Sequence, residues 1–309
     1  MIGGIGGWLA TPVAAGDEGW RRRVPPRVAL RLVRRHLMDL PAPTAPPGVT
    51  AAPLELFLRI GPRDLDVAPL ALASLRHHLA NPLSRVVVST PRASVADVRE
   101  RLPGAEIGAD EDLVDTAIEA ALVAAAPPDR LGWVRQQFLS LIHVSTRARA
   151  PCLIWDADTI MLRRQLLLRD RAARLAISQE HHQPYFTLVR SLLPDLPLPM
   201  YTSTVAHHLV VDPNLLGELL AEIERGPGGG PWWRALTSHL DRTNPSPMAD
   251  YELYGQWIRT RHPDRVDLVA FRNTAMARTA YSVETARWLE RQQRLDTVSL
   301  HWWVPGAMA

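Results

Sequence analysis

Short apolar runs alternate with stretches of helical periodicity along this chain from residue 54 onward. Runs of Leu, Val and Ile that are too short for a helix are typical of strands buried in a sheet. Strands that alternate with helices predict an α/β fold, with a central, mostly parallel sheet flanked by helices. The predicted strands lie at 54–60, 86–89, within 106–112, and at 152–155, 176–178, 209–211 and 266–269. The predicted helices lie at 67–79, 115–126, 129–142 and 215–225, and one more begins at 250.

The run 152–155 stands out because it ends in two carboxylates, Asp156 and Asp158. Residues two apart in extended chain point to the same side, so both carboxylates can reach one point. Open α/β sheets bind ligands beyond the carboxyl ends of their strands. Two oxygen ligands there, with no Cys–His cluster beside them, suit Mg2+ or Mn2+ holding a phosphate-bearing substrate. A loop with two solvated aspartates is the structural alternative.

Length and composition are those of a globular protein. With 309 residues, 47% of them hydrophobic, the chain can bury the core of one domain of roughly 250 residues plus a tail. No apolar run approaches the roughly 20 residues needed to cross a bilayer. A single cysteine, Cys152, excludes a disulfide framework and a cysteine metal knuckle.

The charged residues exclude several functions. All 35 basic residues are Arg, so a Walker A loop and a Lys Schiff base are ruled out. A net charge of +3, with acidic residues interspersed, gives no argument for nucleic-acid binding.

Residues 1–50 are predicted to form an N-terminal extension, with a basic amphipathic helix and a Pro-rich linker, ahead of a domain at 51–309. The basic segment 21–40 either contacts an anionic membrane peripherally or simply covers the domain. We therefore expect a cytoplasmic protein, with any membrane contact at the inner face.

Four motifs occur in order along the chain: Gly-Trp-Val-Arg-Gln-Gln at 132–137, Trp-Asp-Ala-Asp-Thr at 155–159, His207-His208, and Tyr-Glu-Leu-Tyr-Gly at 251–255. This set resembles the nucleotide-sugar glycosyltransferases of the GT-A (Rossmann-like) fold that carry an Asp-x-Asp motif. It is most similar to an uncharacterised bacterial glycosyltransferase-like family, from about residue 53 to residue 303. The resemblance implies a metal-dependent transferase that moves a sugar from a nucleotide-diphosphate sugar, with UDP the commonest carrier, to a hydroxyl acceptor.

The resemblance also implies roles for individual residues. Asp156, Asp158 and His301 would hold Mn2+ or Mg2+, although His301, beside two tryptophans, can equally be a packed surface residue. The predicted nucleotide-sugar-binding residues are Arg59, Gly61, Arg63 and Asp64 in the first loop, Arg135 and Gln136 on the helix, and Asp156, His207 and His208. Each has a structural alternative: the loop residues can form only a turn, Arg135 can only pair with a carboxylate, and one histidine can belong to the core.

Inverting transfer needs a carboxylate base to deprotonate the acceptor. Glu252 is the first candidate and Asp250 the second; in a retaining enzyme they would bind the sugar or the acceptor instead. Trp232 and Trp233 can supply an aromatic platform for an acceptor sugar ring, or can be core residues. The acceptor is left open between a glycan, a lipid-linked sugar and a small natural product.

Two other function classes remain. Asp-Ala-Asp-Thr-Ile at 156–160 is similar to the motif of haloacid-dehalogenase phosphatases, in which the first Asp is a nucleophile. That family carries its motif on the first strand, whereas here it lies in mid-chain. The other class is a non-catalytic protein that binds a nucleotide or a partner.

Overall fold

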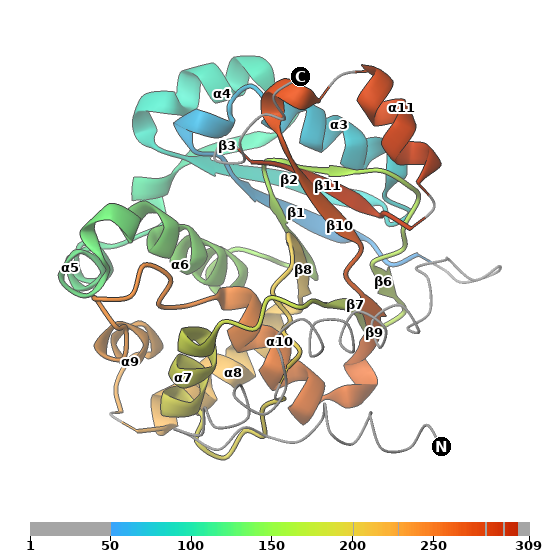
Figure 1. Ribbon diagram of the computed structural model, residues 1–309. Coiled ribbons are helices and arrows are strands. Elements are labelled where there is room, and N and C mark those ends of the chain that lie inside the picture. The colour runs from blue at the N-terminus through green and yellow to red at the C-terminus, as the bar shows by residue number, and fades with distance from the viewer. Residues whose placement is uncertain (1–50, 200, 228, 282, 293, 302–309) are drawn as a thin grey trace, which may run out of the picture.

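A five-stranded sheet forms the centre of the molecule in the computed structural model, which describes residues 51–301 except 200, 228, 282 and 293 (Figure 1). The predicted extension at residues 1–50 lies outside the described residues. The strand order is β3-β2-β1-β4-β8. The strands are β1 (Leu54–Arg59), β2 (Leu83–Thr90), β3 (Glu106–Ala109), β4 (Cys152–Asp156) and β8 (His208–Val211). The first four are parallel, and β8 pairs antiparallel with β4 at the edge.

Both faces of this sheet are buried, which explains the continuous apolar runs in its strands. Along β4, Cys152 and Ile154 pack into the core on one face, while Leu153 and Trp155 pack into the core on the other. This is the alternation that extended chain imposes. Cys152 is completely buried, as expected for a small apolar residue.

Helices cover the two faces unequally. α3 (Ala68–His78) and α4 (Val95–Arg101) lie on one side, and most of the other helices form a layer on the opposite side (Figure 1). These are α5 (Thr116–Ala125), α6 (Leu131–Thr146), α7 (Gln183–Leu192), α8 (Pro213–Arg225), α9 (Trp232–Ser238) and α10 (Asp250–Arg261). None of the helices within the described ranges has the length and apolar character that crossing a membrane requires.

Local sequence explains where helices begin. Asp115 caps α5 by accepting a hydrogen bond from the Ile118 amide, 2.8 Å away. Asp212 caps α8 in the same way, through the Asn214 amide at 2.9 Å. Pro213 then occupies the first position of α8, where no amide proton is needed.

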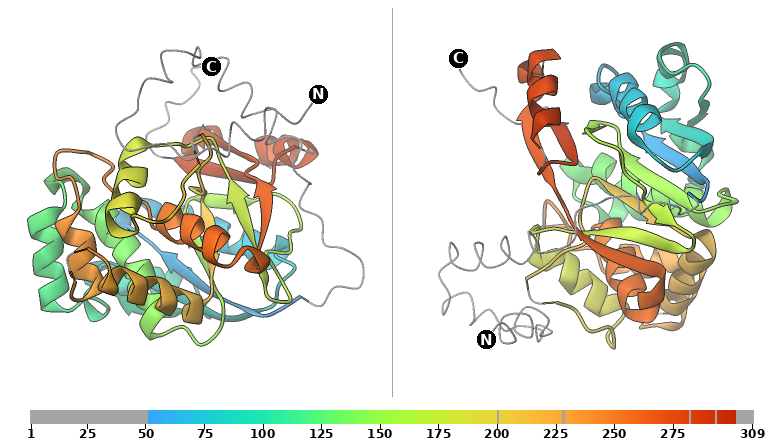
Figure 2. Two further views of the ribbon diagram at one scale, coloured as in Figure 1. Left: turned by 90° about the horizontal axis from the view of Figure 1, so that it is seen from below. Right: turned by 90° about the vertical axis from the view of Figure 1, so that its right-hand side faces the viewer.

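Two small sheets extend the domain. One has the order β10-β11-β5 and consists of β10 (Asn273–Ala277), β11 (Thr297–His301) and β5 (Thr159–Met161). The other has the order β6-β7-β9, from β6 (Leu168–Arg169), β7 (Ala172–Ile177) and β9 (Val266–Ala270). In the right-hand view of Figure 2, β10 and β11, with α11 (Val283–Arg291), stand beside the main sheet. The predicted α/β class, with a mostly parallel sheet flanked by helices, is confirmed.

Candidate active site

Several of the predicted site residues meet where the strand order reverses, at the carboxyl ends of β1 and β4. In open α/β sheets this switch point opens the crevice in which ligands bind. Arg59, the last residue of β1, is the register partner of Asp156, the last residue of β4. The Arg59 guanidinium lies 3.2 Å from Asp110, beyond β3, and 14% of its side chain is exposed. The sheet therefore brings Arg59 and Asp156 side by side.

Asp156 is held by two side chains from distant parts of the chain. His207 Nδ1 lies 2.8 Å from Oδ2, and the Tyr251 hydroxyl donates to Oδ1 at 2.8 Å. His207 reaches this position because it precedes β8, and its carbonyl accepts from the Asp156 amide at 3.0 Å. The Asp156 and His207 side chains remain 25% and 21% exposed. A ligand can therefore reach both.

Asp158 and His301 form a second carboxylate–imidazole pair. β11 runs antiparallel to β5, with Ser299 opposite Thr159. The Leu300 amide donates to the Asp158 carbonyl at 2.8 Å. As a result, His301 Nδ1 lies 2.9 Å from Asp158 Oδ2. The predicted C-terminal histidine thus reaches the Asp-x-Asp motif.

The two pairs form one cluster, because the rings of His207 and His301 have centroids 5.3 Å apart. Burial, the largest single influence, works to raise the pKa of Asp158. The hydrogen bond and charge of His301, together with the charges of His207 and Arg278, outweigh it and hold the pKa below its ordinary value. Burial, again the largest single influence, works to lower the pKa of His207. The hydrogen bond to Asp156 and the negative charges of Asp156, Asp158 and Glu180 together outweigh it, so that this pKa is raised. The cluster therefore favours the ionised form of Asp158 and the charged form of His207.

Arg278 closes the loop that follows β1, a contact that the sequence did not predict. It forms an ion pair with Asp64 and donates to the Arg63 carbonyl. Burial is the main cause of the raised pKa of Asp64, and the nearby charge of Asp158 adds to it. Gly61 has an extended backbone, with φ of −78°, and a Cβ there would make only an ordinary contact with Asp64 at 3.5 Å. The conformation at Gly61 therefore does not require glycine.

Asp250 lies beside Asp156 at the start of α10, with 5% of its surface exposed. Its amide donates to Gln137 Oε1 at 2.8 Å, and its Oδ1 accepts from the Tyr251 amide at 3.0 Å. Burial raises the pKa of Asp250 to about 7, and the charge of Asp156 adds to the increase. Asp250 is thus a carboxyl group that exchanges a proton near neutral pH.

Glu252 points away from the site into the core, which contradicts its predicted role as the base. The side chain is completely buried. Its carboxylate accepts hydrogen bonds from the Ser203 hydroxyl, the Gln256 amide group and, at 3.2 Å, the Thr204 backbone amide. Burial raises the pKa of Glu252 to about 7. In this arrangement Glu252 braces the segment 203–204 and cannot reach a bound acceptor.

His208 also differs from its predicted role. Successive residues of a strand point to opposite faces, so His208 turns away from Asp156 when His207 faces it. It stacks on Trp155 with ring centroids 5.1 Å apart and is 8% exposed. Burial lowers the pKa of His208 to about 4, so the ring is neutral. His208 is a core residue, the structural alternative for one of the two histidines.

The Arg-Gln-Gln motif contributes through a different residue from those predicted. Arg135 forms a two-point ion pair with Glu119 of α5, with Nε 3.0 Å from one carboxylate oxygen. It therefore ties two helices together instead of reaching Asp156. Gln136 is half-buried at the next position. Gln137 is the residue that supports the site, through its bond to the Asp250 amide.

Trp232 and Trp233 belong to the helical layer and not to the end of β4. Trp232 stacks on Phe138 of α6 with ring centroids 5.7 Å apart, and Arg234 lies 5.2 Å above the Trp233 ring. Both tryptophans pack against the main hydrophobic core, and α9 packs on α5 and α8. These contacts fit the core alternative and not the predicted acceptor platform.

Glu180, which received no role from the sequence, lies at the site between β7 and α7. It is exposed and interacts electrostatically with His207, His182 and Asp156. Desolvation is nevertheless the largest cause of its raised pKa. The sequence feature that could have pointed to Glu180 is the unusually polar run Gln179–Gln183. Other contacting residues that the sequence left without a role are Tyr251, Gln137 and Arg278.

Two side chains at the site, Asp158 and His301, present donor atoms that suit a divalent metal. Asp158 Oδ2 and His301 Nδ1 offer a hard oxygen and an imidazole nitrogen side by side, with side chains 13% and 10% exposed. Over residues 51–301, apart from the four positions left out, no group of three His, Cys, Asp or Glu side chains is arranged to hold an ion. Mg2+ usually takes only one or two carboxylates and completes its shell with water and substrate phosphates. The residues therefore fit an ion that shares its ligands with a phosphate, but not a closed protein site.

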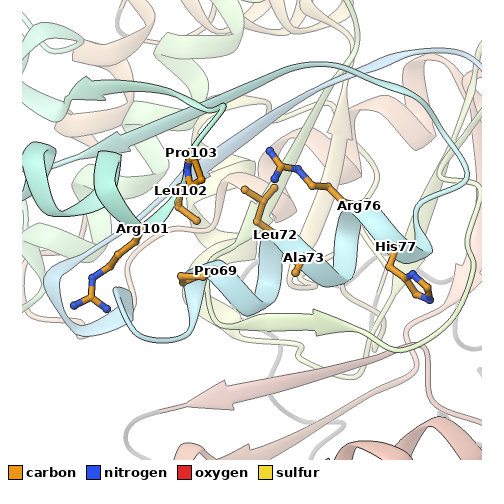
Figure 3. Close-up of a pocket in the computed structure, with 8 residues that line it drawn as sticks. All are labelled: Pro69, Leu72, Ala73, Arg76, His77, Arg101, Leu102 and Pro103. Carbon is orange, nitrogen blue, oxygen red and sulfur yellow. The ribbon is translucent and has the colours of Figure 1, made fainter.

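A separate hollow, of about 390 Å3, lies between α3 and α4 (Figure 3). Its lining is Pro69, Leu72, Ala73, Arg76, His77, Arg101, Leu102 and Pro103. It contains none of the predicted site residues. The carboxylate and imidazole side chains that could take part in a reaction lie instead at the carboxyl end of β4.

Comparison with known proteins gives a distant structural likeness. No family model and no curated protein matches the chain. Among solved structures, the apo form of mouse xyloside xylosyltransferase 1 is similar, with a TM-score of 0.39 and 13% identity, over 82% of this chain and 99% of that chain. A likeness at this level says nothing about the reaction, which has to be inferred from the residues of this chain.

Proposed function

We propose that this chain is a divalent-metal-dependent glycosyltransferase of the GT-A type, which moves a sugar from a nucleotide-diphosphate sugar to a hydroxyl acceptor. The observation that carries the proposal is the pairing of Asp158 with His301 beside Asp156, at the switch point of the sheet. It joins the Asp-x-Asp motif to a C-terminal histidine at a ligand-accessible position. UDP as the carrier rests on the sequence resemblance alone.

Asp158 and His301 are the residues that would hold Mn2+ or Mg2+. A bound ion would neutralise part of the negative charge that the leaving diphosphate gains. Asp156, fixed by His207 and Tyr251, would orient the ribose or the metal-bound phosphate. The raised pKa of His207 favours a positive charge beside this position.

Arg278 is a cation near Asp158 that could contact the diphosphate, because its charge lowers the pKa of Asp158. Its nitrogens are bonded to Asp64, Asp66 and the carbonyls of Arg63 and Leu300. A diphosphate would therefore take the place of one of these partners. A guanidinium matches phosphate oxygens in two-point geometry. Arg59, at the end of β1, supports the same role from the other side of the switch point.

Two carboxyl groups could accept the proton of an acceptor hydroxyl. Asp250 has a pKa of about 7, which suits proton transfer at neutral pH. Glu180 is exposed and interacts electrostatically with Asp156. An inverting reaction would use one of them, and a retaining reaction would use both only for binding.

A haloacid-dehalogenase-like phosphatase is less well supported. Its nucleophile would be Asp156, which needs a free carboxylate oxygen to attack a phosphate. Here one oxygen accepts from Tyr251 and the other is paired with His207. The motif also lies on β4 and not on the first strand.

The test is a thermal-shift panel of nucleoside diphosphates, each with and without Mn2+ or Mg2+. Because a ligand that binds the folded state raises the melting temperature, one nucleotide should stabilise the protein only when metal is present. That result supports the transferase and names the carrier. If no nucleotide shifts the melting temperature with either metal, the transferase proposal fails.

A further inference from the structure

A row of aromatic and charged side chains leads away from the Asp156–His207 pair toward the start of α6. Its members are Glu180, His182, Tyr185, Trp133 and Arg130. Glu180 is the member nearest the pair, because it interacts electrostatically with both Asp156 and His207. The row therefore begins at the proposed site of transfer.

Direct contacts join the members of the row. His182 meets Tyr185 edge-on, with ring centroids 4.7 Å apart. Tyr185 is stacked on Trp133 at 6.4 Å with an interplanar angle of 28°, and the Arg130 guanidinium lies 4.7 Å above the Trp133 ring. Tyr185 is 5% exposed, while Trp133, His182 and Arg130 are half-buried. A buried tyrosine thus supports side chains that solvent can reach.

The fold explains why these residues meet. α6 precedes β4 in the chain and packs on the sheet, so its first turn lies at the carboxyl end of the strands. Arg130 immediately precedes α6, and His182 immediately precedes α7. α10 packs on both helices, and its first residue, Asp250, is bonded to Gln137 of α6. The starts of α7 and α10 therefore lie near Asp156, and the first turn of α6 is joined to α7 through Trp133 and Tyr185.

We propose that this row is the acceptor-binding face and that the acceptor presents a sugar ring to Trp133. This inference rests on the proposed glycosyl transfer. The face of an indole ring binds the apolar face of a sugar ring, and a few polar groups around it fix the orientation. Because Arg130 lies above the Trp133 ring, the sugar would take its place there and Arg130 would turn toward the sugar hydroxyls. Glu180 and His182 offer such groups between Trp133 and Asp156. An acceptor hydroxyl at Glu180 would then lie next to the donor.

Two polar atoms of the row also lack partners. Arg130 Nε and His182 Nε2 make no hydrogen bond within the part of the chain that the structure describes. Neighbouring side chains cover both atoms, so a small side-chain rotation would accompany their contact with a ligand. Hydroxyl groups of a sugar would supply the missing bonds.

Trp133 has a matched control in Trp233. Both pack at the edge of the main core, and both carry an arginine above the ring, at 4.7 Å for Trp133 and 5.2 Å for Trp233. Only Trp133 belongs to the row that reaches Glu180. A purely structural role would make the two tryptophans behave alike.

The experiment uses 19F NMR of the full-length protein labelled with 5-fluorotryptophan, with UDP and Mn2+ present. The probes are p-nitrophenyl glycosides of glucose, galactose, mannose and xylose, and Trp133→Phe and Trp233→Phe assign the two resonances. We expect at least one glycoside to move the Trp133 signal and to leave the Trp233 signal in place. Trp133→Ala should weaken the binding of that glycoside about tenfold, which corresponds to the loss of one stacking contact. Trp233→Ala should not change it.

The proposal is overturned if a glycoside binds without moving the Trp133 signal, if both tryptophan variants weaken binding equally, or if no glycoside of the panel binds. Failure of the proposed function gives a different result. In that case no nucleoside diphosphate stabilises the wild-type protein with Mn2+ or Mg2+, whatever the Trp133 signal does.

Discussion

Asp158 and His301 are 143 positions apart in the chain, and a hydrogen bond of 2.9 Å joins their side chains. The contact exists because β11 pairs with β5, the short strand that begins immediately after Asp158. The candidate site is therefore complete only when the C-terminal sheet has docked on the main domain. This dependence guides the choice of tests, because a variant must be shown to keep this docking before its activity is interpreted.

Asp158→Asn should abolish the metal-dependent response to nucleotide while leaving the fold intact. The carboxamide still accepts a hydrogen bond from His301, but it has lost the negative charge that a divalent ion requires. We expect transfer activity to fall by at least about 100-fold, as when other preorganised electrostatic groups are removed. Circular dichroism and the thermal-shift panel with Mn2+ measure the two properties separately.

Asp267→Asn is the matched control, because Asp267 forms an exposed ion pair with Arg169 at 3.1 Å, in the small β6-β7-β9 sheet. It should keep both nucleotide binding and activity. Wild-type activity in Asp158→Asn would remove the metal hypothesis.

Arg278→Gln should weaken nucleoside-diphosphate binding about tenfold or more, because a charge-assisted contact to phosphate is lost. Arg135→Gln should leave the dissociation constant unchanged, since Arg135 pairs with Glu119 across two helices. It should also cost at most about 1 kcal/mol of stability, as a partly exposed ion pair does. Isothermal titration of UDP with Mn2+ compares the two variants directly. Equal losses of affinity would return Arg135 to the role that the sequence predicted for it.

The predictions that held are those in which local pattern determines structure. The strands β1, β2 and β4 were predictable because side chains of each pack into the core on both faces of the sheet, so each contains a run of mainly apolar residues. β5 and β6 were not, because strands of two or three residues carry no periodic signal. The docking of β11 beside Asp158 could not be predicted either, because it joins two segments that are far apart in the sequence.

The sequence indicated which residues could belong to the site more readily than it indicated where their side chains point. In a strand, His207 and His208 must point to opposite sides, but the sequence does not say which one faces the site. Along α10, successive residues are rotated by about 100°, so that Tyr251 reaches Asp156 while Glu252 points to Thr204. Only tertiary packing fixes that rotation. The motif at 251–255 thus contributes Tyr251 to the surroundings of Asp156, while Glu252, the predicted base, lies buried in the core.

Gly255→Ala should destabilise the protein by about 1–3 kcal/mol, the usual cost of overpacking. A Cβ at Gly255 would lie 2.5 Å from the Thr204 Cβ, so the segment 203–204 would have to move. Urea unfolding gives the change in the free energy of unfolding.

Gly217→Ala is the control, because Gly217 lies exposed in α8 with nothing within 4 Å of its added Cβ. It should stabilise by about 0.5–1 kcal/mol, since alanine is the better helix former. If both substitutions stabilise, the close approach of α10 to Thr204 is not a constraint on the fold.

Glu252→Gln distinguishes a structural glutamate from a catalytic base. The pKa of Glu252 is raised by burial from 4.5 to about 7, so between these values the folded state binds a proton more tightly than the unfolded state does. Stability therefore falls as pH rises through this window, because ionising the buried carboxyl group favours unfolding. Burial raises the pKa of Asp250 from 3.8 to about 7, so its ionisation also lowers the free energy of unfolding as pH rises, starting near pH 3.8.

In Glu252→Gln the share of this fall that belongs to Glu252 should disappear, so the free energy of unfolding should decline less steeply between pH 4.5 and 7. Gln256 can accept the new amide proton, because its buried Oε1 has no hydrogen-bond partner in the described part of the chain. Urea unfolding across this pH range measures the slope. If the free energy of unfolding changes with pH in the same way for variant and wild type, ionisation of the buried Glu252 side chain does not reduce stability.

Since Glu252 is sealed beneath Ser203 and Thr204, the variant should also retain kcat. A lost kcat with intact nucleotide binding would show instead that α10 moves during turnover and brings Glu252 to the acceptor.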